Sequence, residues 1–114
     1  MESICFCLKI KKDKLNEYID IHKKGQVWEA VLNNFRNANI KKLKIFMLEN
    51  TAILYMESPD IKKAFESIGQ QESQLKWNQA TAAFMDTQPN YDSDKIVDDL
   101  PCIFDFEDGE QKDT

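Results

Sequence analysis

The sequence predicts one α+β domain of the ferredoxin-like class, in which the elements follow the order β–α–β–β–α–β. First, residues 4–11 alternate between apolar and more polar side chains, which is the period of a strand. Second, two further alternating runs, 43–48 and 52–57, flank a short polar turn and predict an antiparallel hairpin. Third, the segments on either side of this hairpin carry apolar residues at helical spacing.

The first helical region is predicted in two pieces. Asp13 follows the first strand and is expected to cap a helix over 13–23, whose apolar side chains recur at the i, i+3, i+4, i+7 positions. Gly25 is expected to interrupt this helix, because glycine is a poor helix former. The apolar spacing resumes over 26–38, which predicts the second piece.

The second half of the chain is predicted to complete the domain over residues 1–106. Ser58 and Pro59 are expected to begin a helix as its cap and first residue, and Gly69 to end it. The remaining predicted elements are a helix over 72–85, an irregular loop over 91–99, a final strand over 102–106 and a mobile acidic tail over 107–114.

A sheet with helices on one face leaves its other face open, and the predicted strands are rich in apolar side chains. More apolar strand surface is present than one helical layer uses; it comes from Phe6, Leu8, Ile45, Phe46, Leu54, Tyr55 and Phe104. We therefore expect a homodimer in which two sheets pack face to face and enclose a barrel-like cavity in each subunit.

Charge and cysteine usage narrow the classes of partner. The formal net charge is −5, and residues 86–114 carry ten Asp and Glu against two Lys, which argues against nucleic acid or an anionic membrane as a partner. No apolar stretch is long enough to span a membrane, and no signal peptide is predicted. The three cysteines, Cys5, Cys7 and Cys102, fit reduced thiols in a cytoplasmic protein and lack the paired spacing of a zinc site.

The candidate site is centred on His22, the only histidine. Tyr18 lies four residues earlier and therefore shares its helical face, and Trp28 follows just beyond the expected helix break. An imidazole, a phenol and an indole this close can form a small-molecule site. The same pattern also occurs at the edge of an ordinary helix core, so local spacing alone leaves both interpretations open.

The joint placement of these residues resembles the L-rhamnose mutarotase family over nearly the whole chain, about residues 3–106. The resemblance is carried by Glu17-Tyr18 and His22 on the first helix, Trp28-Glu29 opening the next, and Lys76-Trp77 on a late helix. It implies a dimeric α/β barrel without cofactor or metal, with His22 as catalytic acid and Tyr18 in contact with the sugar. It further implies that Trp28 and Trp77 shape the sugar pocket.

The chain departs from the family pattern at two pocket positions. Leu43 stands where the rhamnose enzymes carry a tyrosine on the second strand, and Asn78 replaces the second tryptophan of an adjacent pair. Five residues separate His22 from Trp28, where the rhamnose enzymes typically have three. The fucose-directed relatives also lack the doubled tryptophan, so the resemblance leaves another deoxy sugar open.

The implied activity is interconversion of the α and β anomers of a 6-deoxy-hexose, L-rhamnose or L-fucose, by His-assisted acid/base ring opening. Tyr18 is the favoured second acid/base group, and Glu57 and Asp20 are the other candidates. The alternative is a non-catalytic dimeric α/β-barrel protein that binds a small ligand or serves as an interaction module. A third possibility is another barrel enzyme, such as a cofactor-free monooxygenase.

Overall fold

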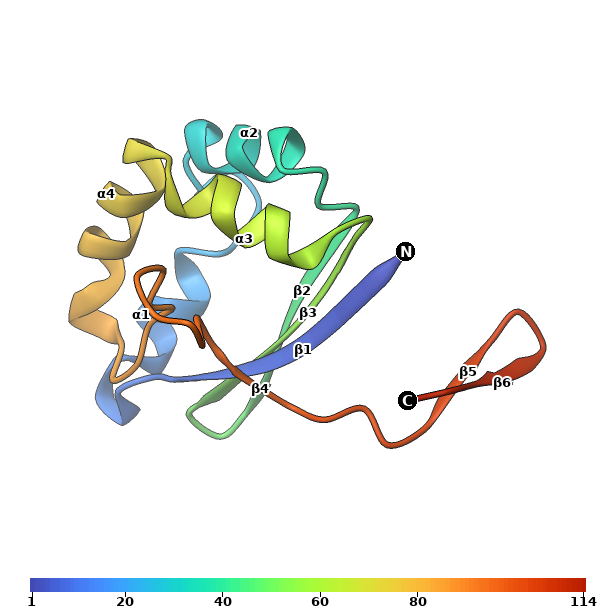
Figure 1. Ribbon diagram of the computed structural model, residues 1–114. Coiled ribbons are helices and arrows are strands. Elements are labelled where there is room, and N and C mark those ends of the chain that lie inside the picture. The colour runs from blue at the N-terminus through green and yellow to red at the C-terminus, as the bar shows by residue number, and fades with distance from the viewer.

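The computed structural model describes residues 1–114 and has the predicted ferredoxin-like architecture (Figure 1). A four-stranded antiparallel sheet has the strand order β2-β3-β1-β4, so the first and third strands lie at its centre. The elements are β1 (Glu2–Lys9), α1 (Leu15–Asp20), α2 (Glu29–Asn37), β2 (Lys42–Leu48), β3 (Thr51–Ser58), α3 (Ile61–Gly69), α4 (Glu72–Thr81), β4 (Asp98–Asp99), β5 (Asp105–Glu107) and β6 (Glu110–Lys112). Short 3-10 turns at Lys12–Lys14 and Ala82–Phe84 precede α1 and follow α4.

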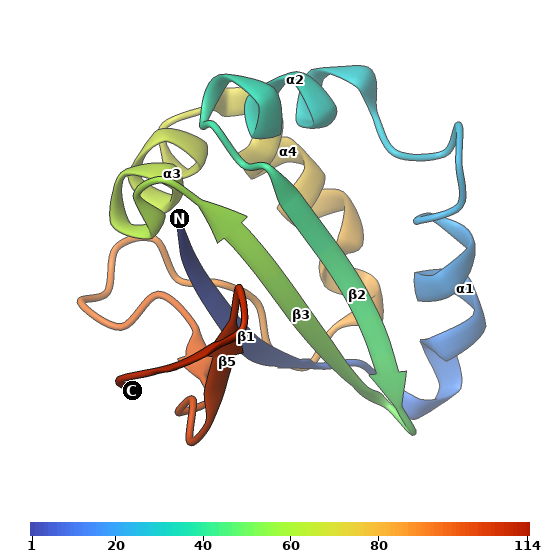
Figure 2. The ribbon, with the colours of Figure 1, turned by 90° about the vertical axis from the view of Figure 1, so that its right-hand side faces the viewer.

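The four helices lie around one face of the sheet, and Figure 2 views the opposite face, which no helix covers and in front of which the C-terminal hairpin is drawn. Strands β1 and β3 pair along their whole length, and β2 pairs with the other edge of β3. Alternation along β3 assigns Ala52, Leu54 and Met56 to the helix side, where all three are buried. The main core is this face of the sheet with the helices over it: Phe6, Leu8, Ile10, Tyr18, Ala38, Ala52, Leu54, Met56, Ala64, Phe65, Ile68 and Val97.

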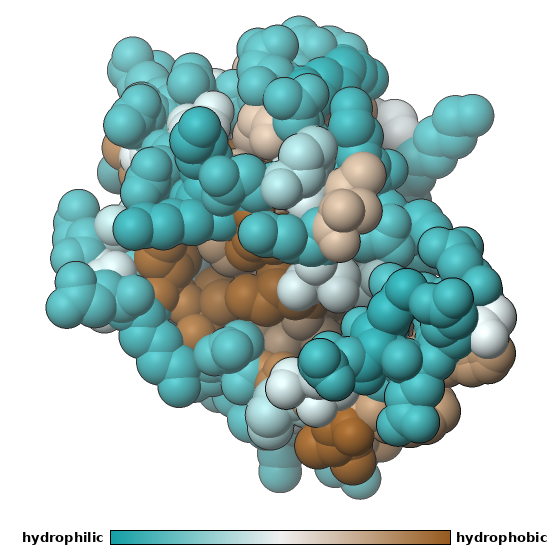
Figure 3. All heavy atoms as spheres, turned by 45° about the vertical axis from the view of Figure 1, so that its right-hand side comes forward, coloured by the Kyte–Doolittle hydropathy of each residue, from teal (hydrophilic) through white to brown (hydrophobic).

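The uncovered face of the sheet carries apolar side chains. Phe46 and Leu48 on β2 are 56% and 65% exposed, and Ile53 and Tyr55 beside them on β3 are half-buried. Figure 3, taken from between the views of Figures 1 and 2, shows hydrophobic side chains in a hollow that polar ones surround. A second sheet packed on this face remains a prediction.

The cavity does not need a second copy, and this corrects the expectation of a space enclosed by two sheets. Phe6 and Leu8 on β1, Ile45 on β2 and Leu54 on β3 all point to the helix side of the sheet, where they line a cavity within one chain. Their apolar surface is therefore used by the helices and the cavity, and only part of the predicted excess lies on the open face.

The first helical region is shorter than predicted. Asp13 lies within the 3-10 turn and does not cap α1, which ends at Asp20. Gly25 adopts a φ of +89°, a left-handed conformation that glycine tolerates and other residues rarely adopt, so the chain turns there as predicted. The second piece begins only at Glu29, with Trp28 extended at the N-cap.

The start of α3 also differs from the prediction. Asp60 is the N-cap, and its side-chain oxygen accepts a hydrogen bond from the backbone N–H of Lys63 at 3.1 Å. Ser58 is instead the last residue of β3 and is buried, and Pro59 lies before the cap. The carboxylate of Asp60 can reach the third N–H of the helix, whereas the pairing of Ser58 with β1 holds it in the strand.

The fourth strand lies earlier in the chain than predicted. Asp98 and Asp99 of β4 pair with β1, and the N–H of Leu100 donates to the carbonyl of Cys5 at 2.7 Å. Pro101 follows immediately and has no N–H to continue the ladder. The chain then leaves the sheet, so most of the expected strand over 102–106 is irregular.

The C-terminal segment forms a small hairpin that projects from the body of the domain (Figure 1). Strands β5 and β6 are joined by Asp108 and Gly109, both with positive φ, the conformations of a type I′ turn. The Asp-Gly pair is a strong hairpin signal that the prediction of a tail over 107–114 did not use.

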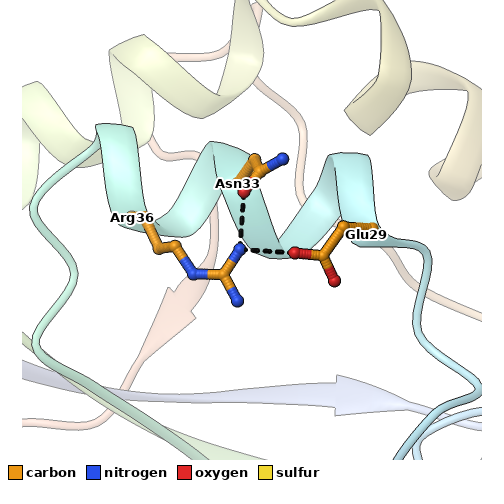
Figure 4. A network of polar contacts seen from close by, with 3 residues as sticks. All are labelled: Glu29, Asn33 and Arg36. Carbon is orange, nitrogen blue, oxygen red and sulfur yellow. Dashed lines mark hydrogen bonds and ion pairs between the residues drawn. The ribbon is translucent and has the colours of Figure 1, made fainter.

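The outer face of α2 carries a small polar network. The guanidinium of Arg36 donates to Glu29 at 2.8 Å and also to Asn33 on the same face of the helix (Figure 4). Both charged side chains are largely exposed, so the pair contributes little stability. No helix in the structure is both long and apolar enough to cross a bilayer.

Candidate functional site

A cavity of about 430 Å³ lies between the helix side of the sheet and the helices. This volume is within the range of small-molecule sites, about 300–1,000 Å³. Seventeen of its 23 lining residues are hydrophobic, and none is an Asp or Glu. Its polar groups are therefore few: the imidazole of His22, the amides of Gln74, Asn78 and Gln88, the hydroxyl of Thr81, and the phenols of Tyr18 and Tyr91.

His22 lies in the turn that follows α1, two residues after the helix ends. Its Nδ1 is 2.7 Å from the backbone carbonyl oxygen of Tyr18. Because a carbonyl only accepts hydrogen bonds, the proton of the neutral ring is on Nδ1, and Nε2 keeps its lone pair. Burial lowers the pKa of His22 from its usual value, and the hydrogen bond to the carbonyl partly opposes this effect. The neutral ring is consequently the resting form near pH 7.

Tyr18 is almost fully buried, and its ring centroid is 4.5 Å from that of His22. Burial raises the pKa of Tyr18 to about 12, because the phenolate would lose its hydration. The hydroxyl is thus protonated at neutral pH and suits hydrogen bonding better than general-base catalysis.

The two tryptophans meet beside His22. Trp77 on α4 lines the cavity, with its ring centroid 6.0 Å from that of His22 in an edge-to-face arrangement. Trp28 packs edge to face on Trp77 at 5.1 Å but is 41% exposed and lies outside the cavity lining. The structure therefore brings all four predicted residues together, with Trp28 behind Trp77.

An amide-rich wall was not recognised in the sequence. Gln74 and Asn78 are one turn apart on α4, on the side that also carries Trp77 and Thr81, and Gln88 follows from the next loop. Gln88 Nε2 donates to the backbone carbonyl of Asn78 at 2.7 Å, and the Thr81 hydroxyl donates to that of Trp77 at 3.0 Å. In the sequence, Asn78 and Thr81 follow Gln74 at four and seven residues, the spacing of one helical face. This spacing did not indicate a site, because a polar face of a helix usually faces solvent.

Both departures from the family pattern lie at this cavity. Leu43 lines it from β2 and Asn78 from α4. Leu43 places an apolar side chain where the family pattern has a tyrosine, and Asn78 places an amide where the pattern has a tryptophan. The polarity of the cavity lining therefore differs from the family pattern at these two positions.

The two carboxylates considered as second acid/base groups are elsewhere. Glu57 lies on the open face of the sheet, where it accepts a hydrogen bond from the Tyr55 hydroxyl at 2.6 Å. Asp20 pairs with Lys23 at 2.9 Å on the surface. Neither lines the cavity, which leaves His22 as its one group with an ordinary pKa near neutrality.

Comparisons with known proteins agree with this architecture. The sequence profile of the L-rhamnose mutarotase family matches residues 3–106. Among solved structures, an L-rhamnose mutarotase from Formosa agariphila superposes with a TM-score of 0.75 and 19% sequence identity, covering 94% of this chain and 100% of that one. At this identity the likeness is evidence of the shared fold. None of the curated proteins searched matches the sequence.

Proposed function

Because the chain belongs to the L-rhamnose mutarotase family, we propose that it is a cofactor-free mutarotase. The reaction is interconversion of the α and β anomers of a 6-deoxy-hexose, with L-rhamnose as the first candidate and L-fucose as the second. The observation that carries the proposal is one neutral imidazole, His22, placed in an otherwise uncharged cavity beside an indole and a phenol.

Mutarotation requires only that protons move between two oxygens on one carbon. The anomeric hydroxyl loses its proton, the bond from the anomeric carbon to the ring oxygen breaks, and the ring oxygen gains a proton. We assign both transfers to Nε2 of His22, which takes the first proton as a base and delivers it as an acid. The open-chain aldehyde then rotates and closes with the reverse transfers. A positioned acid/base group supplies about 10²–10⁴-fold, and sugars already mutarotate slowly in water.

The other cavity residues are assigned to binding. Trp77 offers an apolar ring face to the C–H groups of the sugar, and Tyr18, held protonated, hydrogen-bonds a sugar oxygen. The apolar lining suits the methyl group that distinguishes a 6-deoxy-hexose. Trp28 supports the orientation of Trp77 through its edge-to-face contact.

We further propose a homodimer formed through the open face of the sheet. Phe46 and Leu48 remain largely exposed in the single chain, and Ile53 and Tyr55 extend the same apolar surface. Because the cavity lies on the opposite face, dimer formation would leave its lining unchanged.

Exchange NMR on the equilibrium anomers of L-rhamnose and L-fucose tests the activity. The wild-type protein should transfer magnetisation between α and β signals faster than buffer does, and His22→Gln should reduce this to the buffer rate. Asp20→Asn is the matched control, because it removes a titratable group from the surface at the adjacent end of α1. If wild-type protein leaves the exchange rate of both sugars unchanged, the mutarotase proposal is wrong.

A non-catalytic sugar-binding protein is the second candidate, and Leu43 and Asn78 favour it, because they alter the lining at two points. In that case sugar would shift protein NMR signals of the cavity residues without any acceleration of anomer exchange.

A further inference from the structure

The cavity contains one buried polar atom that the protein itself leaves unpaired. Gln74 is 6% exposed, and its carbonyl oxygen Oε1 is the only buried side-chain nitrogen or oxygen without a hydrogen-bond partner. Buried polar groups are nearly always paired, because an unpaired one loses its hydration without compensation. Gln74 also lines the cavity, so a rotation of its flexible side chain would bring Oε1 within reach of a bound molecule.

The surrounding contacts determine which end of the amide is free. Gln74 Nε2 donates to the side-chain oxygen of Asn78 at 3.3 Å. The next residues of the wall are held in turn, since Gln88 Nε2 donates to the Asn78 backbone carbonyl and to the hydroxyl of Thr81. Burial raises the pKa of Tyr91, and a hydrogen bond from the Asn78 side chain to the Tyr91 hydroxyl partly opposes this rise, so the Asn78 amide N–H points to Tyr91 and its oxygen to Gln74. With Asn78 oriented in this way, rotating the Gln74 amide would bring two carbonyl oxygens together, so the unpaired atom is an acceptor.

The chemistry of the cavity lining indicates which kind of hydrogen-bond donor would bind to Gln74 Oε1. A cationic ligand is disfavoured, because no carboxylate lines the cavity to neutralise it and most of the wall is hydrophobic. A neutral hydroxyl meets both conditions, since it donates one proton and carries no charge. Trp77 lies one turn away on the same helix, so a ring stacked there can direct a hydroxyl to Gln74.

We propose that Gln74 determines substrate specificity by accepting a hydrogen bond from one non-anomeric hydroxyl of the sugar. This inference rests on the proposed function and deepens it: the substrate is a sugar that carries this hydroxyl, and the analogue lacking it is rejected. A site built to pair with a hydroxyl discriminates strongly, because the analogue leaves the buried group unpaired.

The test is a cycle of two protein variants and a set of sugars. Exchange NMR gives kcat/KM for L-rhamnose and for its 2-, 3- and 4-deoxy analogues with wild type and Gln74→Met, which keeps the length of the side chain and removes the acceptor. Wild type should disfavour one analogue by about 5- to 100-fold relative to L-rhamnose. Gln74→Met should lose most of that preference, while its rate with that analogue stays within about twofold of wild type.

Gln79→Met is the matched control, because Gln79 is an exposed glutamine on the same helix outside the cavity lining, and it should preserve the wild-type preference. Thermal unfolding separates a structural role: without sugar, Gln74→Met should unfold close to the wild-type temperature, since the unpaired Oε1 and the long hydrogen bond from Nε2 to Asn78 are removed together. A clear loss of stability assigns Gln74 to supporting Asn78 and contradicts the inference.

The remaining outcomes separate this inference from the mutarotase proposal. If wild type accelerates exchange but Gln74→Met affects every sugar equally or none, Gln74 does not determine specificity and the activity stands. If wild type accelerates nothing, binding of the same sugars is measured from protein NMR shifts. A preference that depends on Gln74 then supports the inference without the activity, and no binding of any sugar overturns both.

Discussion

Replacement of Gly69 by alanine tests how the loop after α4 is anchored over the cavity. A Cβ built at Gly69 would lie 2.8 Å from Cδ1 of Tyr91, 2.9 Å from Cγ and 3.0 Å from its Cβ. Carbon atoms pack best at about 3.5–4.0 Å, so the ring would have to move by about 0.7 Å. Tyr91 is half-buried and lines the cavity, and burial raises its pKa to about 12. Such a shift would therefore change both packing and the shape of the site.

The expected change in the free energy of unfolding for Gly69→Ala is the difference between two opposing effects. Overpacking costs about 1–3 kcal/mol, whereas alanine in a helix is favoured over glycine by about 1 kcal/mol. Gly69 ends α3 without a positive φ, so backbone strain does not add to the balance. We therefore expect Gly69→Ala to lower the free energy of unfolding by about 1 kcal/mol, with a higher KM for the sugar.

Urea unfolding of the single and double variants measures this effect. In a Tyr91→Ala background the obstacle is absent, so Gly69→Ala should become stabilising by up to about 1 kcal/mol. The change of sign between the two backgrounds is the expected result. If Gly69→Ala stabilises the protein equally in both, Tyr91 does not pack on this position and the reasoning is refuted.

Three further predictions concern the acid/base group and local stability. The anomer exchange rate should fall as pH falls, because protonation removes the Nε2 lone pair of His22. Burial lowers the pKa of His22, so the midpoint of this fall should lie below the usual histidine value of 6.5. A pH series of exchange rates measures the midpoint, and a midpoint above 6.5 would contradict the prediction. The same lowered pKa should make His22 destabilising as pH falls through its unfolded-state value, and His22→Gln should remove that part of the pH dependence in thermal unfolding. Asp60→Ala should lower the free energy of unfolding in urea by about 1 kcal/mol, because the Lys63 N–H loses its cap. Arg36→Gln should lower it by less, because the pair of Arg36 with Glu29 is exposed. Equal losses would contradict the assignment of Asp60 as the N-cap of α3.

Local pattern accounts for the central elements but not for their ends. The hairpin of β2 and β3 was predicted because both strands alternate over several residues, and the structure confirms it. Both ends of α1 and the start of α3 were misplaced by a few residues because the capping partner depends on backbone geometry, as Asp60 shows, whereas α3 ends at Gly69 as predicted. The fourth strand was assigned to the more hydrophobic segment 102–106, whereas its pairing is set by where Val97 is buried and where Pro101 ends the ladder.

The sequence by itself determined the order of elements, the apolar strand faces and the closeness of Tyr18 and His22, because these depend on the spacing of residues within each local structure. Only the tertiary structure decided that the cavity lies within one chain, that Glu57 and Asp20 are remote from it, and that Trp28 stands behind Trp77. It also revealed the unpaired carbonyl of Gln74. A polar side chain on a helix has the same local pattern whether it faces water or a cavity, and its neighbours along the chain cannot distinguish the two. Contacts between segments far apart in sequence make that distinction.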